Sequence, residues 1–294
     1  PDHIEKAVQQ YNQEILFWEQ RLQQDTQSYV SLQELGHNYL SLFQLKGKID
    51  DLKTGDSLLK VAAAKLNYVD PDMLHALSQV AITQHQFRQA ALYNQAAAQQ
   101  NGSPYVHALL SFDVEMELGR YHTAKGFLNV LKEREAFDIL IRKAKYQDHI
   151  GDLEGAIVLM ETAFEKVVQT NKKNLYCWAL ANLGDMYGHA GRIEEAYAAY
   201  LKVLEKDASY LYAPKGIAWI TYAHDENITA SKRILQFIKS HTHAPDVYLL
   251  LAEIAEFENR QEEKKEYIQQ FLKMVADPAY NDMYNKALIK IYTE

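Results

Sequence analysis

The sequence has one cysteine, Cys177, among 294 residues. A single thiol cannot form an internal disulfide, and it offers none of the paired spacing that marks a cysteine metal site. No apolar run approaches the roughly 18 residues that a membrane-spanning helix needs. We therefore expect a chain without a disulfide framework or a transmembrane segment, in which Cys177 is a packing residue near a helix start.

An excess of basic charge is also missing. The chain has 31 lysines and arginines against 39 aspartates and glutamates, which gives a net charge of -8. Nucleic-acid binders gather basic residues into a patch or stripe, whereas here the basic residues are dispersed among acids. This distribution predicts no nucleic-acid partner and weakly favours neutral or basic partners.

Sequence motifs for catalysis are absent. The chain contains no HExxH, no CxxC pair, no glycine-rich phosphate loop and no GxSxG, which are the short motifs tied to metal, phosphate and nucleophile chemistry. The eleven histidines are scattered, and the nearest pair, His241 and His243, falls in an apparent loop. Because catalysis needs convergent groups, we expect no enzymatic activity, no metal and no cofactor.

Linkers are missing as well, although the chain is longer than most single hydrophobic cores. No stretch rich in proline, glycine or serine divides it. A repeat array reconciles the length with the uniform composition, because the core of a solenoid grows along its length.

The clearest positive pattern lies in residues 177–210. Apolar and small residues recur there at steps of three or four, which is the spacing of an amphipathic helix. Gly191 interrupts the pattern once, so the stretch predicts two antiparallel helices joined by a tight turn. The residues that carry the pattern are Leu180, Leu183, Gly184, Tyr187, Ile193, Ala196, Tyr200 and Val203.

The turn is repeated in two other places. Leu118-Gly119-Arg120-Tyr121 and Ile150-Gly151-Asp152-Leu153 match Ala190-Gly191-Arg192-Ile193, and each is followed at the same offset by an alanine. Glycine supplies backbone freedom at the end of the first helix, and the alanine lets the paired helices approach closely.

This combination of Leu-Gly, tyrosine, turn glycine and alanine resembles the tetratricopeptide repeat, whose period is about 34 residues. The resemblance covers nearly the whole chain. It implies an all-α fold, a right-handed α-solenoid of stacked antiparallel helix pairs whose inner surface is lined by the first helix of each repeat. It also implies a protein that binds peptides or other proteins.

The pattern divides the chain into one continuous solenoid over residues 1–294. Residues 1–28 are expected to form an N-terminal helix, either a half repeat or a cap, and residues 279–294 a C-terminal capping helix. The expected repeats are 29–70, 71–104, 105–136, 137–176, 177–210, 211–244 and 245–278. The first of these is longer than the period, and its surplus at residues 46–57 predicts an extended turn or a lengthened helix rather than a functional loop.

Registering the first helices against Gly184 places polar and aromatic residues on the inner surface of the repeats from 137 to 244. An aromatic side chain beside hydrogen-bonding groups is typical of an interaction hot spot. The alternative is that Trp219 and Tyr222 pack between helices while the charged residues are merely solvated. The candidate residues are Lys145, Asp148, His149, Asp185, His189, Tyr212, Lys215, Trp219 and Tyr222.

The leading hypothesis is a non-enzymatic scaffold that binds a peptide or protein in the concave groove. Two others remain open: a regulatory module that responds to a small ligand or signalling peptide by changing its pitch, and a structural part of a cell-envelope assembly. The sequence leaves the oligomeric state and the compartment open, since either a cytoplasmic or an exported protein is consistent with it.

Overall fold

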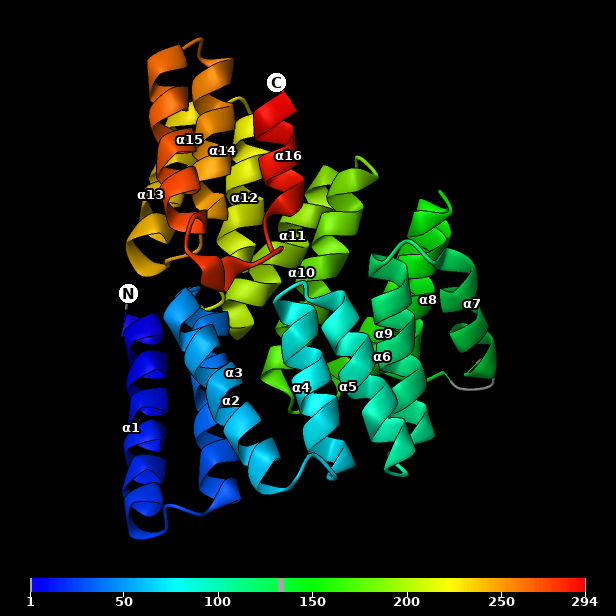
Figure 1. The fold of residues 1–294 in the computed structure, drawn as a ribbon. Helices are drawn as coiled ribbons and strands as arrows, with labels where there is room; N and C mark the ends of the chain where they lie inside the picture. The colour runs from blue at the N-terminus through cyan, green and yellow to red at the C-terminus, as the bar shows by residue number, and fades with distance from the viewer. Residues whose placement is uncertain (1, 132–134, 294) are drawn as a thin grey trace. The chain divides into compact units, whose positions relative to one another are not determined.

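The computed structural model describes residues 2–131 and 135–293 of the chain. Within these residues there are sixteen α-helices, one short 3-10 helix and no strand (Figure 1). None of the helices in the described part combines the length and the apolar character that crossing a membrane demands. The all-α class expected from the sequence is confirmed.

The helices follow one another with short connections. Their bounds are α1 (Asp2–Gln24), α2 (Tyr29–Lys46), α3 (Ile49–Lys65), α4 (Pro71–Thr83), α5 (Phe87–Gln99), α6 (Pro104–Glu117), α7 (Tyr121–Val130), α8 (Phe137–His149), α9 (Leu153–Val168), α10 (Lys173–His189), α11 (Ile193–Lys206), α12 (Tyr212–Ala223), α13 (Ile228–His241), α14 (Asp246–Phe257), α15 (Gln261–Val275), the 3-10 helix η1 (Pro278–Tyr280) and α16 (Asn285–Thr293).

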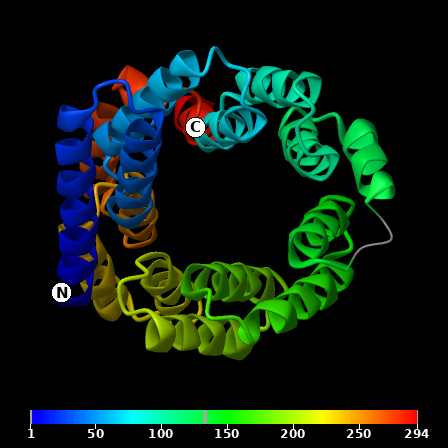
Figure 2. The ribbon, with the colours of Figure 1, turned by 90° about the horizontal axis from the view of Figure 1, so that it is seen from below.

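The chain divides into two compact units, which we describe separately. The first unit comprises Val8–Leu131 and Lys273–Glu294, and the second comprises Pro1–Ala7 and Lys132–Leu272. Both units contain consecutive helices that pack against each other as antiparallel pairs, for example α2 with α3 and α10 with α11. Figure 2 shows these helix pairs stacked in two layers within each unit.

Side-chain caps explain where several helices begin. Ser28, Asp70 and Asp152 each accept a hydrogen bond from the backbone N–H three residues later, at the start of α2, α4 and α9. Such a cap satisfies one of the backbone donors that the first helical turn leaves unpaired. Pro71 and Pro104 occupy the first position of their helices, where a missing N–H costs nothing.

The three predicted turn glycines have the backbone conformation that the sequence indicated. Gly119, Gly151 and Gly191 have φ angles of 73°, 88° and 73°, in the left-handed region that only glycine adopts without a steric cost. The alanines that follow them are fully buried between paired helices. Cys177 is fully buried in the second turn of α10, which begins at Lys173, so it is a packing residue near a helix start as expected.

The surplus of the long first repeat is helical. The turn is limited to Gly47 and Lys48, and α3 begins at Ile49, so residues 46–57 mainly lengthen a helix. Gly55 lies where α3 crosses α2: a Cβ atom there would be 2.9 Å from the carbonyl oxygen of Gly36. This glycine pair therefore permits a close helix crossing.

Each unit has its own buried core. In the second unit the core is rich in alanine on α8 to α12, with Ile157, Met160 and Leu183 among its larger members. In the first unit the core lies between α2, α3 and α4, and includes Leu52 and Leu59. Residues 132–134, which the sequence placed near the end of the repeat 105–136, lie outside the described residues.

The C-terminal segment differs from the single capping helix expected over residues 279–294. It consists of η1, a turn and the shorter helix α16. Tyr280, only 4% exposed, packs in the first-unit core with Ile49, Leu52 and Met73. The start of this segment is thus buried against helices from the beginning of the chain.

Candidate functional site

The nine candidate residues lie on three first helices of the second unit. Lys145, Asp148 and His149 are exposed on α8, Asp185 and His189 lie on α10, and the remaining four lie on α12. Helix α10 contacts α12 directly. The first helices α10 and α12 of two neighbouring repeats therefore lie side by side within this unit.

Tyr200 of α11 packs against α10 and α12 on the side away from their exposed surface. Its ring passes between Gly184 of α10 and Gly216 of α12: a Cβ atom on Gly184 would lie 2.8 Å from the ring, and one on Gly216 would lie 2.4 Å from it. A side chain at either position would displace the tyrosine. The two glycines thus create the space through which a side chain of the second layer reaches the first.

Asp185 is held by two tyrosine hydroxyls. Tyr200 donates a hydrogen bond of 2.6 Å to Oδ1, and Tyr212 donates one of 2.6 Å to Oδ2. Burial, reinforced by the Asp185 carboxylate, raises the pKa of Tyr200 above its usual range. The hydroxyl therefore stays protonated and acts as a donor to a charged acceptor, which is the stronger kind of hydrogen bond.

Lys215 and Trp219 continue the surface along α12. The Lys215 ammonium lies 4.7 Å from the centroid of the Tyr212 ring and forms an ion pair of 2.5 Å with Asp246 of α14. Trp219 is 39% exposed. A Cβ atom on Gly188 of α10 would lie 3.9 Å from the Trp219 ring, so the indole lies beside α10 while much of it faces solvent.

Tyr222 is placed differently from the other candidates. It is only 9% exposed, and its ring meets that of Phe257 edge-on at 5.5 Å. The packing alternative raised from the sequence thus describes Tyr222, whereas Trp219 keeps open surface. Asp185 accepts hydrogen bonds from Tyr200 and Tyr212, and these bonds join α10, α11 and α12.

Sequence reasoning did not assign functional positions to Tyr200, Gly216 or Asp246. The signal for the first two is present in the sequence: a glycine occurs on each of two consecutive first helices, with a tyrosine on the helix between them. Trp178 of α10, also 39% exposed, lies outside the positions that the repeat register selects. Asp246 gave no local signal, because its role depends on α14 meeting α12.

Metal and thiol chemistry find no support among the described residues. They contain no group of three or more His, Cys, Asp or Glu side chains that could hold a metal ion. Cys177 is fully buried, and burial raises the pKa of its thiol to about 11. A protonated buried thiol is a poor nucleophile.

The solved structures with similar folds include repeat proteins. A tetratricopeptide repeat protein from Parabacteroides merdae superimposes with a TM-score of 0.55 at 16% identity, covering 91% of this chain and 100% of that chain. A Rap protein complexed with Competence and Sporulation Factor gives a TM-score of 0.62 at 14% identity, covering 91% and 85%. The fold is tetratricopeptide-repeat-like. No family model and no curated protein matches the sequence.

Other tetratricopeptide-like matches show the breadth of the fold. The human IFIT1 dimer with PPP-AAAA gives a TM-score of 0.57 at 15% identity, covering 91% of this chain and 69% of that chain. The Cut9-Hcn1 structure gives 0.58 at 17% identity, and this chain spans 45% of the matched chain's length. At such identities the likeness concerns the fold, and function has to be argued from the site.

Proposed function

We propose that this tetratricopeptide-like chain is a non-enzymatic scaffold that binds a peptide or protein segment on the surface formed by α10 and α12. We name this the Trp219 surface and define it by Asp185, His189, Tyr212, Lys215 and Trp219. The single observation that carries the proposal is an exposed tryptophan beside polar side chains that are already held in place by one another.

Trp219 supplies the apolar contact. Tryptophan, tyrosine and arginine dominate interface hot spots because a large flat side chain buries much area at little cost in conformational entropy. In the free protein, 39% exposure leaves part of the indole in water. Covering it with a partner would remove that area from water, which stabilises a complex.

The polar groups supply orientation. Asp185 accepts from Tyr200 and Tyr212, and Lys215 pairs with Asp246. Because these groups already have partners, a ligand that covers them leaves no charge unpaired. Their fixed positions also reduce the ordering cost of binding, which improves affinity.

A polypeptide fits this surface better than a nucleic acid. Asp185, Asp246 and the exposed Glu253 lie on α10 and α14, whereas the five residues that define the Trp219 surface include one lysine, Lys215. Phosphate groups need neutralising cations, and this balance offers few. The Rap protein complexed with Competence and Sporulation Factor and the IFIT1 dimer with PPP-AAAA show that such folds hold different ligands. The acidic charge balance of this surface favours a polypeptide ligand over a nucleic acid.

The experiment is affinity capture from an extract of the cells that encode the protein, followed by mass spectrometry. Wild-type chain is compared with a Lys145→Glu/Trp219→Ala double variant and with the single variant Trp219→Ala. The matched control is Tyr197→Ala, which removes an exposed aromatic side chain from α11 in the second helix layer. Circular dichroism verifies that all the variants are folded.

A partner retained by wild type and by Tyr197→Ala, and lost from both Trp219 variants, is the expected result. Truncation of a hot-spot aromatic typically costs about 2 kcal/mol or more, which is roughly a thirtyfold loss of affinity. Equal retention by all four proteins would refute the Trp219 surface. If no protein is retained and small-angle scattering shows compaction with a small ligand, the scaffold proposal is wrong and the regulatory alternative replaces it.

A further inference from the structure

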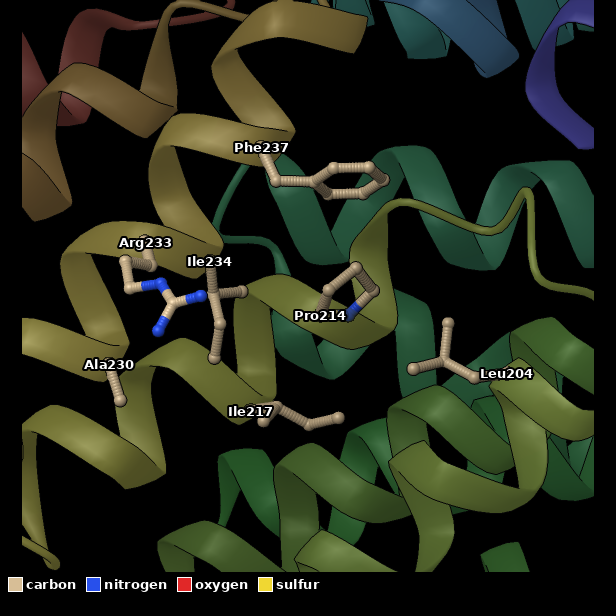
Figure 3. Close-up of a pocket in the computed structure, with 7 residues that line it drawn as sticks. All are labelled: Leu204, Pro214, Ile217, Ala230, Arg233, Ile234 and Phe237. Carbon is tan, nitrogen blue, oxygen red and sulfur yellow. The ribbon is translucent and has the colours of Figure 1, made fainter. Parts of the chain in front are cut away.

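A second feature of the same unit lies among its second helices. A cleft with a volume of about 480 Å3 opens between α11 and α13, with α12 as its floor. Figure 3 shows Leu204 from α11, Pro214 and Ile217 from α12, and Ile234 and Phe237 from α13 around it. The lining is apolar except for Arg233 of α13.

The cleft lies beside the core face of α13. Helices α11 and α13 begin 35 residues apart, at Ile193 and Ile228, so that Ser231 matches Ala196 and Ile238 matches Val203. All four of these residues are buried, whereas Phe237 is 37% exposed. The core positions of α13 are therefore filled as in the preceding repeat, and Phe237 lies outside that core.

Arg233 is the one charged residue among those that line the cleft. Arg233 is exposed, and the described residues record no hydrogen bond or ion pair for its guanidinium. Helix α13 contains no carboxylate between Ile228 and His241, although the chain as a whole carries a net charge of -8. The neighbouring Lys232 is already paired with Glu258. Arg233 is therefore the charged group of the lining that lacks an acidic counterpart.

We propose that this cleft binds an amphipathic helix of a partner protein, with apolar residues one turn apart on the cleft floor and a carboxylate paired with Arg233. Laying an apolar helix face into a hydrophobic groove is an established mode of recognition. The unpaired guanidinium selects an acidic partner, because an arginine and a carboxylate form a directional pair of hydrogen bonds.

The openness of the cleft favours a helix over a small ligand. Small-molecule sites enclose most of their ligand's surface, but the exposure of Phe237 and Arg233 leaves one side of this cleft open. A helix needs only one covered face. It would also cover Phe237, whose side chain is 37% exposed in the free protein.

The cleft is independent of the Trp219 surface. Pro214 and Ile217 point to one side of α12, and by helical spacing Lys215 and Trp219 lie on the other side. The two proposals can therefore be tested with separate variants. A loss of cleft binding in an Arg233 variant says nothing about Trp219, and the reverse also holds.

The test is selection of a displayed library of helical peptides against the full chain, followed by fluorescence anisotropy with the enriched peptides. The variants are Arg233→Glu and Phe237→Ser. Arg88→Glu, an exposed arginine of α5, is the charge-matched control, and Trp219→Ala reports on the other surface. Circular dichroism verifies that every variant keeps its helical content.

We expect enriched peptides with apolar residues at helical spacing and a glutamate or aspartate beside them. Arg233→Glu should weaken their binding about tenfold or more, as removal of a charged partner does at other interfaces, with Arg88→Glu and Trp219→Ala unchanged. A peptide whose acidic residue is replaced by lysine should regain binding to Arg233→Glu. This reciprocal rescue would not arise from unfolding.

Three results would overturn the proposal. The first is enrichment of peptides that are insensitive to both cleft variants, or no enrichment at all. The second is binding of sodium laurate in isothermal titration that Phe237→Ser abolishes, which would assign the cleft to a small amphiphile. The third is self-association in sedimentation that Arg233→Glu abolishes, which would make a second copy of the chain the occupant.

Discussion

His75 of α4 is a buried histidine whose ring nitrogen Nε2 has no hydrogen-bond partner among the described residues. Burial lowers its pKa below the usual value of 6.5; nearby His107 of α6 lowers it further, and Asp72 of α4 acts in the opposite direction. From α5 the side chain of Asn94 packs in the same region, with its Oδ1 atom also unpaired. Burial therefore favours the neutral form of His75 in the folded protein.

This neutral histidine should make the first unit sensitive to acid. The unfolded chain binds a proton at His75 near pH 6.5, whereas the folded chain does so only at lower pH, so stability is lost as the pH falls through 6.5. The loss is at most about 1.4 kcal/mol per pH unit for one proton. Urea unfolding monitored between pH 7.5 and 5.5 measures it.

His75→Phe should flatten this dependence, because the phenylalanine ring does not titrate. The matched control is His122→Gln, which replaces an exposed histidine of α7 and should leave the slope unchanged. An equal slope in wild type and His75→Phe would show that other groups cause the loss of stability in acid.

At the level of helices, several turns share one backbone conformation, a positive φ angle, although different residues adopt it. Gly119, Gly151 and Gly191 have positive φ angles, as the glycine-based pattern predicted. His85 and Glu226 connect other helix pairs with φ angles of 56° and 53°. For a residue with a side chain this region costs roughly 1 kcal/mol or more.

Replacing Glu226 by glycine should therefore stabilise the protein. Its side chain is exposed, so the substitution removes strain without removing buried contacts. Part of the gain is offset by the greater freedom of glycine in the unfolded chain, which leaves about 0.5 kcal/mol. The expected result is a higher urea midpoint.

The reverse change provides the matched comparison. Gly191→Ala introduces a side chain at a φ of 73° where no neighbouring atom lies within 4 Å, so any loss of stability reports the backbone alone. A lower midpoint for Glu226→Gly, or no loss for Gly191→Ala, would contradict the strain argument.

These helices also show what the sequence could predict. Local spacing was sufficient to identify helix pairs and turn glycines, because both depend on neighbours within one repeat. It did not reveal that Gly55 lies at a helix crossing, since that depends on the carbonyl of Gly36 opposite. The contact of Lys215 with Asp246 is equally non-local. The candidate residues on α10 and α12 could be proposed from register, but which of them bond to one another could not.

At the scale of the whole chain, one contact between segments far apart in sequence buries Tyr280 in the first unit. Helical periodicity predicted that the chain would end in a cap, but periodicity does not say which surface a terminal segment covers. Here η1 contacts α3. Residues from the two ends of the chain therefore share one core.

Tyr280→Ala should loosen that core. Removing a buried aromatic side chain typically costs about 3 kcal/mol, and the lost contacts lie on α3 and α4. Hydrogen exchange followed by mass spectrometry should show faster exchange in Ile49–Lys65, with Ile193–Lys206 of the second unit unchanged. Tyr292→Ala, which alters a tyrosine 74% exposed on α16, is the control and should match wild type. If α3 exchanges equally slowly in both variants, the C-terminal segment does not stabilise the first unit, and the α2–α4 core is stable without it.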